Sequence, residues 1–414
     1  MNYGCIGARL THSFSAEIHA LIGKYSYKLR EIAPDDLPDF LQNPTFSGIN
    51  VTIPYKQTVI PYLAHIHPKA AAIGAVNTVV NRQGELYGYN TDYTGLAALI
   101  ARTGVSLSGK KVIILGSGGT SLTARCVAED LGAAHILRAS RNPKEPDTVS
   151  YETLLADHTD GQFLINTTPC GMFPNLADCP IHLAPFQNLE GLVDVIYNPL
   201  RTRLVQQATA KGIPALGGLY MLVAQAVAAA EHFLSAPLPA DTTEKIYNTL
   251  LNSKENIVLT GMPSCGKTTV GNLLAAKLNR PFVDVDEEII KAIGCSIPDY
   301  FARFGEDAFR QVEAKVIAEV IAPLTGCVIA TGGGAILREE NVVNLRHNGR
   351  LYFLDRPLTD LCATADRPTA NSREAIQKRY EERYDRYCAT ADRHISVTGD
   401  AAQVAQIIAK DFVL

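Results

Sequence analysis

The chain has 414 residues, and its hydrophobic fraction of 47% and charged fraction of 19% are ordinary for a folded soluble protein. That length suits roughly two to four domains, each with a full hydrophobic core. The formal net charge is -4 and the sequence holds no long run of lysine and arginine, which argues against nucleic acid or an anionic membrane surface as the main partner.

The N-terminal residues MNYGCIGARL show neither an export signal nor a transit-peptide pattern. The most apolar stretch, 219–234, is interrupted by Gln225 and Glu231 and is too polar to span a membrane. We therefore expect a cytoplasmic protein. Nine cysteines without a CxxC pair indicate neither a disulfide framework nor a zinc site, and we expect most of them to be small buried residues.

Strand and helix patterns alternate over residues 1–105. Tyr3 lies in a short strand-like run over 2–8, which a hydroxyl-rich turn follows. Pro34 marks the start of a helix, and Pro54 ends a β-branched strand that begins at Gly48. The remaining expected elements are helices over 35–41 and 70–75, a strand over 77–81, and a helix over 93–102 that residues 90–92 cap.

Polar residues stand at the ends of these elements in a definite order: SxS at 13–15, NVTxPxK at 50–56, GAVNT at 74–78 and NTD at 90–92. Each alone is more often a cap or turn residue. Their joint order resembles the substrate domain of the shikimate dehydrogenase family. The resemblance implies that Ser13 and Ser15 hold a carboxylate, that Thr52, Asn77 and Asp92 hold ring hydroxyls, and that Lys56 and Asp92 form the catalytic pair.

The chemistry of such a pair is plausible without the resemblance. Hydride removal from a carbinol carbon requires a proton to leave the oxygen, and reduction requires the proton to return. A lysine beside a carboxylate is a suitable acid or base, worth roughly 10² to 10⁴ in rate. The alternative for Lys56 and Asp92 is a surface ion pair with almost no effect on activity.

Residues 106–218 begin with the pattern of a dinucleotide-binding βαβ unit. A buried strand over 110–115 leads into a glycine turn with Gly116, Gly118 and Gly119, a helix through Leu131 and a strand over 135–139. Ser140 and Arg141 follow this second strand, where an acidic residue would select NAD; an arginine there pairs with a 2′-phosphate and favours NADP. The alternative for Arg141 is a solvated turn residue.

Later segments extend the resemblance. The strand over 163–166 followed by TTPCGM, and the run LVDVIYNP over 192–199, resemble the family's later strands, which implies that Tyr197 contacts substrate. GGLYMLVAQ over 217–225 resembles the segment that returns to the substrate domain, with Gln225 on a substrate hydroxyl. Gly217 departs from the Asp or Asn common in the family. The helix expected over 221–234 otherwise has the composition of a core helix.

A short junction follows. Residues 235–240 form a proline-punctuated loop, and Asp241 with Glu244 forms a capping box for a helix that we expect to end near Asn252. Only 253–255 then remains as a linker, which is too short for a flexible connection.

The stretch Asn256–Thr269, NIVLTGMPSCGKTT, predicts a strand, a phosphate loop and a helix. Glycines in the GxxxxGKT spacing let backbone N–H groups face phosphate oxygens at a helix N-terminus. Lys267 is expected to reach the β/γ-phosphates, and the Thr268 hydroxyl to ligate Mg²⁺. The ATP-binding residues expected here are Gly261, Ser264, Cys265, Gly266, Lys267, Thr268 and Thr269.

The rest of 256–414 carries further polar signals. A strand over 281–286 ends in Asp284, expected in the Mg²⁺ shell, and Asp286. A long helix is expected to open at 305–310, and a strand over 327–330 runs into Gly332, Gly333 and Gly334. This set resembles shikimate kinase. The resemblance implies that Asp286, Arg310, Arg383 and the three glycines surround shikimate, and that Arg367 lies in a lid over ATP. Asp385 and Arg386 replace the family's frequent proline and apolar residue.

Together these patterns predict an α/β protein: a shikimate dehydrogenase-like substrate domain (1–105 and 219–252), a Rossmann NADP domain (106–218), a linker (253–255) and a P-loop kinase domain with a parallel sheet (256–414). The resemblance implies NADPH-dependent reduction of 3-dehydroshikimate, then phosphorylation of shikimate by Mg²⁺-ATP. Alternatives are a broader quinate/shikimate dehydrogenase fused to a small-molecule kinase, and a non-enzymatic nucleotide or redox sensor. Homo-oligomerisation and channelling stay open.

Overall fold

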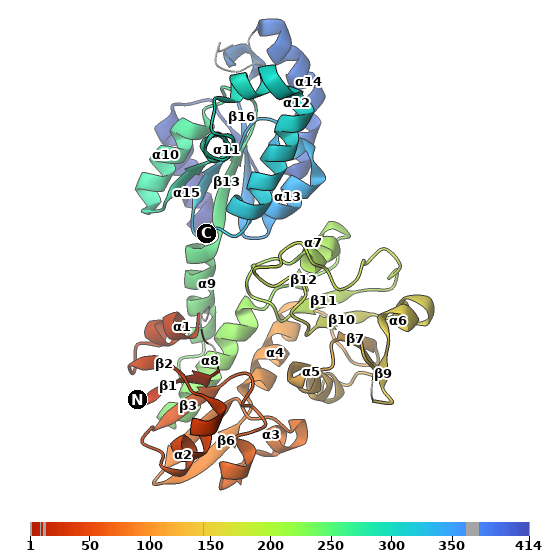
Figure 1. Cartoon of the computed structure of the whole chain (residues 1–414), viewed down its shortest axis with the longest axis vertical. Helices are drawn as coiled ribbons and strands as arrows, with labels where there is room; N and C mark the ends of the chain where they lie inside the picture. Colours follow the sequence, from red (N-terminus) through yellow and green to blue (C-terminus); the bar gives the residue numbers. More distant parts are fainter. Residues whose placement is uncertain (1, 9, 11–13, 144, 362–371, 414) are drawn as a thin grey trace. The chain divides into compact units, whose positions relative to one another are not determined.

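The computed structural model describes residues 2–8, 10, 14–143, 145–361 and 372–413. The chain divides into two compact units. The first contains Met1–Met172, Ala177–Asn198 and Leu204–Leu250, and the second contains Phe173–Leu176, Pro199–Arg203 and Leu251–Leu414. The first unit holds two sheets of six strands and the second holds one sheet of five strands (Figure 1).

The first sheet is mixed. β1 pairs in parallel with β2 and β3, whereas β5 runs antiparallel to β3 and β6. Residues 27–31 form an edge strand that the sequence did not predict, because its alternation is weak and most of its side chains are exposed. In sheet order the strands are β2 (Tyr27–Glu31), β1 (Tyr3–Gly7), β3 (Gly48–Val51), β5 (Thr78–Arg82), β6 (Glu85–Tyr89) and β4 (His65–Ile66).

Two long helices of this unit pack closely on each other, α4 (Thr91–Arg102) and α8 (Leu219–Leu234). Gly95 permits the approach, since a Cβ there would lie 2.6 Å from the Met221 carbonyl oxygen and 3.0 Å from Gln225 Cβ. The predicted helix over 35–41 is instead a 3₁₀ turn, Pro34–Asp36, followed by α2 (Leu37–Gln42). Two further helices are α1 (Ser15–Ile22), which begins where the expected turn over 11–15 ends and which the sequence did not predict, and α3 (Pro68–Ile73).

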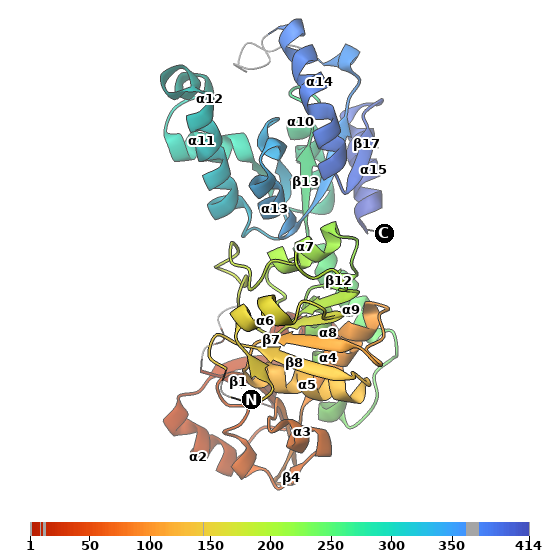
Figure 2. The ribbon, with the colours of Figure 1, turned by 90° about the vertical axis from the view of Figure 1, so that its right-hand side faces the viewer.

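The second sheet is entirely parallel and is buried on both faces. Val112 and Ile114 belong to one apolar cluster, while Ile113 and Leu115 belong to another, as expected for a strand between two helical layers. α5 (Gly119–Asp130) lies against β7 and β8 (Figure 2). In sheet order the strands are β12 (Ala215–Leu216), β11 (Gly191–Asp194), β10 (Phe163–Asn166), β7 (Lys111–Leu115), β8 (His135–Ala139) and β9 (Thr148–Val149), with helices α6 (Tyr151–Asp157) and α7 (Arg203–Ala210).

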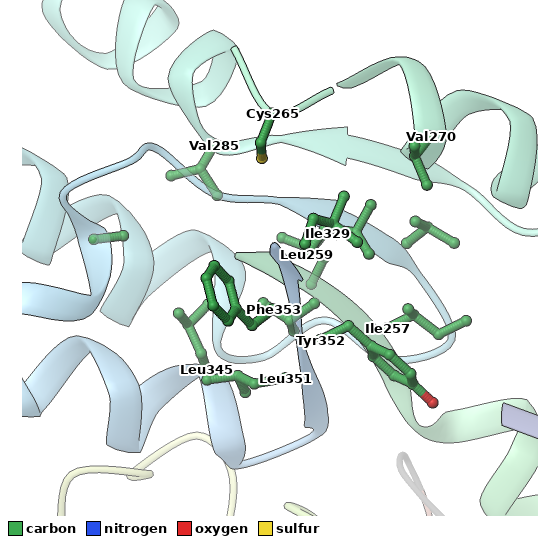
Figure 3. Close-up of a cluster of buried hydrophobic side chains, with 14 of the residues drawn as sticks. Ile257, Leu259, Cys265, Val270, Val285, Ile329, Leu345, Leu351, Tyr352 and Phe353 are labelled. Atoms are coloured by element: carbon green, nitrogen blue, oxygen red, sulfur yellow. The ribbon is translucent and has the colours of Figure 1, made fainter. Parts of the chain in front are cut away.

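The third sheet, in the second unit, is also parallel. α10 (Lys267–Leu278) and α15 (Ala401–Val413) pack side by side on it (Figure 1). Figure 3 shows the buried cluster between strands and helices, into which Cys265 points. In sheet order the strands are β14 (Phe282–Asp284), β15 (Val328–Ala330), β13 (Asn256–Thr260), β16 (Gly349–Asp355) and β17 (Arg393–Ser396).

Two predicted elements of this unit are wrong in their bounds. The strand expected over 281–286 ends at Asp284, because its side chain caps α11 (Val285–Ile293) by accepting a hydrogen bond from the Asp286 N–H. The helix expected to open at 305–310 begins earlier, as α12 (Ile297–Val316), and Gly305 interrupts it at φ 79°. Further helices of this unit are the π-helical turn η3 (Ile317–Ile321), the 3₁₀ turns η4 (Ala335–Leu337) and η5 (Leu358–Asp360), α13 (Glu339–Arg346) and α14 (Arg373–Thr390).

The junction helix is longer than predicted. α9 spans Thr242–Lys254, so only Glu255 precedes β13. Arg102 holds this helix: both its terminal nitrogens donate to Glu244, and its guanidinium lies over the rings of Tyr220 and Tyr247.

Two expectations from the composition concern burial and membrane crossing. Of the eight cysteines in the described ranges, only Cys5, Cys265 and Cys327 are buried, so the expectation that most are buried was wrong. Within the same described ranges, no helix is both long enough and apolar enough to cross a membrane.

We predict that Gly95→Val destabilises the first unit by about 1–3 kcal/mol, because the new side chain must push α4 and α8 apart. Thr94→Val is the matched control, since Thr94 is exposed on the same helix and should change stability by no more than about 0.5 kcal/mol. Urea unfolding followed by circular dichroism measures both. Equal stability of the two variants would contradict the close contact.

Candidate active sites

An ion pair stands at the centre of the first unit's polar cluster. Lys56 Nζ lies 2.6 Å from Asp92 Oδ2, with the Asp92 side chain 6% exposed and that of Lys56 24% exposed. Asp92 is fixed by the first turn of α4, which Asn90 caps by accepting from the Tyr93 N–H. The Lys56 carbonyl accepts from the Val76 N–H at 2.8 Å. The pair is therefore held by backbone on both sides and reachable from solvent on the lysine side.

Asn77 lies in the same cluster with its amide orientation fixed. Its Oδ1 accepts from the Thr91 N–H at 2.7 Å and from the hydroxyls of Thr78 and Thr91. The Nδ2 group is left to donate outward, and it lies 3.5 Å from Gln225 Oε1. The structure thus brings together Asn77, which directly precedes β5, and Gln225 of α8.

Three other expected substrate residues lie at element ends. Ser15 is the first residue of α1. Thr52 follows β3 and packs on Gly7, where a Cβ would lie 2.6 Å from Thr52 Cγ2. Tyr197 follows β11, and its ring lies 5.2 Å from that of Phe14, beside Ser15; burial raises its pKa. Ser13 lies outside the described residues.

A buried polar network behind this cluster was missed from the sequence. Tyr27 donates to Asn50 Oδ1 at 2.7 Å, and Asn50 Nδ2 donates to Thr78 Oγ1 at 3.0 Å. His19 stacks on Tyr27 with ring centroids 3.8 Å apart and shares a 2.7 Å hydrogen bond with the Tyr25 hydroxyl. Burial lowers the His19 pKa to about 3. Asn50, a polar residue between Ile49 and Val51 of an apolar strand, was the available signal.

The glycine turn after β7 fits a bound dinucleotide. A Cβ at Gly118 or Gly119 would meet nothing within 4 Å, which leaves open space at the start of α5. Gly116 has φ 113°, and a Cβ there would lie 2.6 Å from Thr167 Oγ1, so only glycine suits this turn. Ser140 lies after β8, and its hydroxyl is 2.9 Å from that of Ser117. Arg141 beside it is exposed.

Arg138 anchors the loop that carries these residues, a role that the sequence did not reveal. Arg138 lies on β8 with no exposed surface. Its Nε and Nη2 donate to the Asp147 carboxylate at 3.1 and 2.6 Å, and it also pairs with Glu145. Arg125 of α5 donates to the same Asp147 carboxylate at 3.1 Å. Hydrogen bonding from Arg138 lowers the Asp147 pKa. The two hydrogen bonds from the Arg138 guanidinium fix Asp147, which lies at the far end of the loop that begins at Ser140.

The phosphate loop of the second unit has the shape that its sequence predicts. Gly261 and Gly266 have φ values of 143° and 101°, and Ser264 has φ 65°. Lys267 is buried, and its ammonium donates to the carbonyls of Gly261 at 2.8 Å and Met262 at 3.0 Å. The Cys265 side chain points instead into the apolar cluster with Leu259 and Ile329 (Figure 3). The Cys265 Sγ also accepts a hydrogen bond from the Lys267 ammonium at 3.8 Å, so the thiol lies between the apolar cluster and the loop.

Oxygen ligands suited to Mg²⁺ stand beside this loop. Thr268 donates to Asp284 Oδ2 at 2.9 Å, and both Thr268 and Thr269 are exposed on the first turn of α10. A hydroxyl and a carboxylate are the donors that this hard cation prefers. Thr268 and Asp284 are thus brought together as predicted.

Asp286, Arg310 and the triple-glycine loop converge. A Cβ at Gly332 would lie 2.8 Å from Asp286 Oδ1, and one at Gly334 would lie 2.3 Å from the terminal nitrogens of Arg310. Larger residues would fill this space, so the glycines keep the carboxylate and the guanidinium against the loop. Arg310 pairs with Glu313 at 2.7 Å and with Glu306 at 3.1 Å.

Glu313 is a further residue of this site that the sequence analysis missed. It is 1% exposed, and its Oε1 has no hydrogen-bond partner among the described residues. Burial raises its pKa, whereas Arg310 opposes the shift. Its spacing of three from Arg310 on one helix face was the signal that could have found it.

Arg383 and Tyr387 of α14 join the glycine loops. Arg383 is 3% exposed and donates to the Gly333 carbonyl at 3.1 Å, and burial lowers its pKa. The Tyr387 hydroxyl faces the carbonyls of Gly261, at 3.0 Å, and Gly333. Arg386 turns away to the Ile336 carbonyl at 2.9 Å and to Glu339, so it lies beside the site without entering it.

A cavity of about 410 Å³ opens between α12 and α14. Its lining is strongly charged, with both carboxylates and cationic side chains. The lining includes Glu306, Leu337, Lys378, Arg379, Glu382 and Arg383. Arg367, the expected lid residue, lies outside the described residues.

Comparison with known proteins assigns both units. The family model for shikimate kinase matches residues 263–412, and that for the shikimate dehydrogenase substrate binding domain matches residues 5–79. A shikimate dehydrogenase (NADP(+)) of Clostridium perfringens is 35% identical over 266 residues, which are 60% of this chain and 97% of that protein. The chain belongs to the shikimate dehydrogenase family. Its C-terminal part is a shikimate kinase domain.

Solved structures resemble the dehydrogenase part. Shikimate dehydrogenase 1 from Peptoclostridium difficile has a TM-score of 0.56 at 35% identity, covering 60% of this chain and 98% of that one. Shikimate 5-dehydrogenase from Thermus thermophilus, solved in complex with NADP(H) and shikimate, has a TM-score of 0.54 at 27% identity, covering 60% and 99%. The predicted fold class is confirmed, and so is the assignment of two shikimate-pathway enzyme activities to one chain.

We predict that His19 makes the shikimate dehydrogenase part sensitive to acid. Its pKa is lowered in the folded state, so below pH 6.5 the unfolded chain takes up a proton that the folded chain does not. This group should therefore reduce the free energy of unfolding by about 1.4 kcal/mol per pH unit as the pH falls from 6.5 towards 3.

Urea unfolding between pH 5 and 7 measures the effect, with the relevant transition identified by its shift on adding NADP⁺. His19→Gln should flatten the pH dependence relative to the unsubstituted chain. His65→Gln is the matched control, because the His65 side chain is 54% exposed. An unchanged slope in the His19 variant would show that the buried imidazole is not responsible.

Proposed function

We propose that this chain reduces 3-dehydroshikimate to shikimate with NADPH, and then transfers the γ-phosphoryl group of ATP to the shikimate 3-hydroxyl. The observation that carries the proposal is the Lys56–Asp92 pair, 2.6 Å apart beside the fixed amide of Asn77. The kinase step is supported by the meeting of Asp286 and Arg310 at the triple-glycine loop.

In the proposed reduction, Lys56 donates a proton to the carbonyl oxygen of 3-dehydroshikimate as it becomes a hydroxyl. Asp92 accepts a hydrogen bond from the ammonium group and keeps it oriented. Bound NADPH supplies the hydride. Thr52, Asn77, Asp92 and Gln225 bind substrate hydroxyls. Ser13 and Ser15 bind the carboxylate, and Tyr197 contacts the substrate.

The preference for NADP rests on residues at the end of β8. The Clostridium perfringens relative is named as an NADP(+) enzyme and the Thermus thermophilus one was solved with NADP(H). In this chain Ser140 and Arg141 follow the second strand of the βαβ unit, the position from which an arginine accommodates a 2′-phosphate. Gly118 and Gly119 leave open space for the pyrophosphate, and Gly116 at positive φ forms the turn that precedes them. Arg141 is exposed and therefore available to the phosphate.

In the proposed phosphorylation, Asp286 accepts the proton of the shikimate 3-hydroxyl. Arg310 and Arg383 bind the carboxylate, and Lys267 and Arg367 offset charge on the phosphoryl group. Mg²⁺, held by Thr268 and Asp284, would neutralise charge on the phosphates.

The activities are assigned to separate parts of the chain. The substrate domain comprises 1–105 and 219–252, the NADP domain 106–218, and the kinase domain 256–414, with 253–255 between them.

A single reaction mixture tests the order of the two reactions. Purified protein receives 3-dehydroshikimate, NADPH and Mg²⁺-ATP, and mass spectrometry follows the products. Shikimate 3-phosphate supports the proposal; consumption of NADPH without phosphorylated product would refute the kinase half.

We predict that Lys56→Met lowers kcat for reduction by roughly 10² to 10⁴, because the proton donor is lost. Phosphorylation of supplied shikimate should continue at the original rate. Lys69→Met is the matched control: Lys69 also pairs with an aspartate, Asp130, but at the surface. Loss of both activities in the Lys56 variant would refute independent sites.

We further predict that Arg310→Lys raises the KM for shikimate roughly 10-fold or more and leaves that for ATP nearly unchanged, since lysine keeps the charge near Glu313 but not the fork that grips a carboxylate. Steady-state kinetics with each substrate varied in turn measures the two constants. A similar rise in both would contradict the role of Arg310 in shikimate binding.

A further inference from the structure

Arg356 follows directly on β16, at the sheet edge where the phosphate loop begins. β13 and β16 are parallel neighbours with Thr260 opposite Phe353, so both strands end beside the same loop. A Cβ at Gly261 would lie 2.8 Å from the Leu354 carbonyl oxygen, and one at Gly266 would lie 3.8 Å from Arg356 Nη2. The guanidinium therefore lies against the last residue of the loop before α10.

Arg356 has no counterion in the described part of the chain. No described carboxylate pairs with it, and its Nε is buried without a hydrogen-bond partner. Three other arginines of the domain pair with carboxylates: Arg310 with Glu313 at 2.7 Å, Arg350 with Glu255 at 2.7 Å, and Arg393 with Asp411 at 3.1 Å. Arg383 has no described carboxylate partner but donates to the Gly333 carbonyl, whereas no described residue accepts a hydrogen bond from Arg356.

A half-buried cation with an unpaired donor is costly, so an anionic partner other than the described residues is expected. The surroundings add to the positive potential. The N-terminus of α10 points its unpaired N–H groups at the loop, and the Lys267 ammonium lies inside the loop. An anion with several charges satisfies all three groups at once.

We propose that Arg356 is a further nucleotide-binding residue of the kinase domain, whose guanidinium binds phosphate groups that ATP and ADP share. The proposal deepens the kinase function and rests on it. The position favours the shared phosphates, because Gly266 is the loop residue whose neighbours cradle the α- and β-phosphates. A planar guanidinium offers two parallel N–H donors to phosphate oxygens.

Binding by the full chain tests the proposal, with isothermal titration of Mg²⁺-ATP, Mg²⁺-ADP and AMP. Arg356→Gln should raise the Kd of both ATP and ADP by roughly 10-fold or more, as for a lost charged hydrogen bond. The Kd of AMP should change far less. Arg356→Lys should recover part of the loss, since it restores charge but not the fork.

Arg346→Gln is the matched control. Arg346 Nε is likewise buried without a described partner, but Arg346 precedes the opposite end of β16, where its Nη2 donates to the Thr390 carbonyl. This variant should bind ATP as the unsubstituted chain does. Dehydrogenase turnover and the KM for shikimate in the kinase reaction should be unchanged by Arg356→Gln.

Each outcome is decisive. Unchanged Kd values for ATP and ADP in Arg356→Gln would overturn the proposal while leaving the kinase function intact. An equal loss of affinity for AMP would assign the residue to the adenosine part and overturn the phosphate role. If the unsubstituted chain binds ATP but does not phosphorylate shikimate, the proposed kinase function is refuted. The Kd values of the unsubstituted chain and of Arg356→Gln then still test the role of Arg356.

Discussion

Hydrogen bonding between parallel strands determines where this chain places its reactive groups. Parallel neighbours end at the same edge of a sheet, where the backbone must turn and leaves N–H groups without partners. Gly116 follows β7, the phosphate loop follows β13, Gly332–Gly334 follows β15 and Arg356 follows β16. The mixed sheet of the substrate domain behaves in the same way at β3, which leads to Thr52 and Lys56.

Each site also depends on a buried polar group that contacts no expected ligand. Thr78 and Thr91 fix the Asn77 amide, Arg138 fixes the loop after Ser140, and Glu313 fixes Arg310. A buried polar group destabilises the fold when it has no hydrogen-bond partner, and it fixes the orientation of a neighbouring side chain when the two are hydrogen-bonded. The chain thus uses buried pairing to hold exposed or half-exposed side chains in one orientation.

The sequence correctly predicted several elements that begin or end at a glycine, a proline or a capping residue. The phosphate loop, the turn after β7 and the cap of α4 follow from the types of residue and their spacing, so sequence was sufficient for the fold class. Asp286 was assigned to a strand because a short apolar run does not reveal that Asp284 caps the next helix. The kink at Gly305 and the burial of Arg138 depend on distant residues, which no local pattern records. The roles of the individual site residues likewise stay predictions, because proximity alone does not identify a ligand.

The Tyr387 hydroxyl has one hydrogen and faces two carbonyl oxygens, those of Gly261 and Gly333. It can donate to only one of them at a time, and its ring is fixed by stacking on Phe353 with planes 8° apart. The phosphate loop and the triple-glycine loop therefore compete for the single proton of this hydroxyl. Each carbonyl also has a second donor, Lys267 for Gly261 and Arg383 for Gly333. The position of the Tyr387 proton therefore decides which of the two loops has two hydrogen bonds at its carbonyl and which has one.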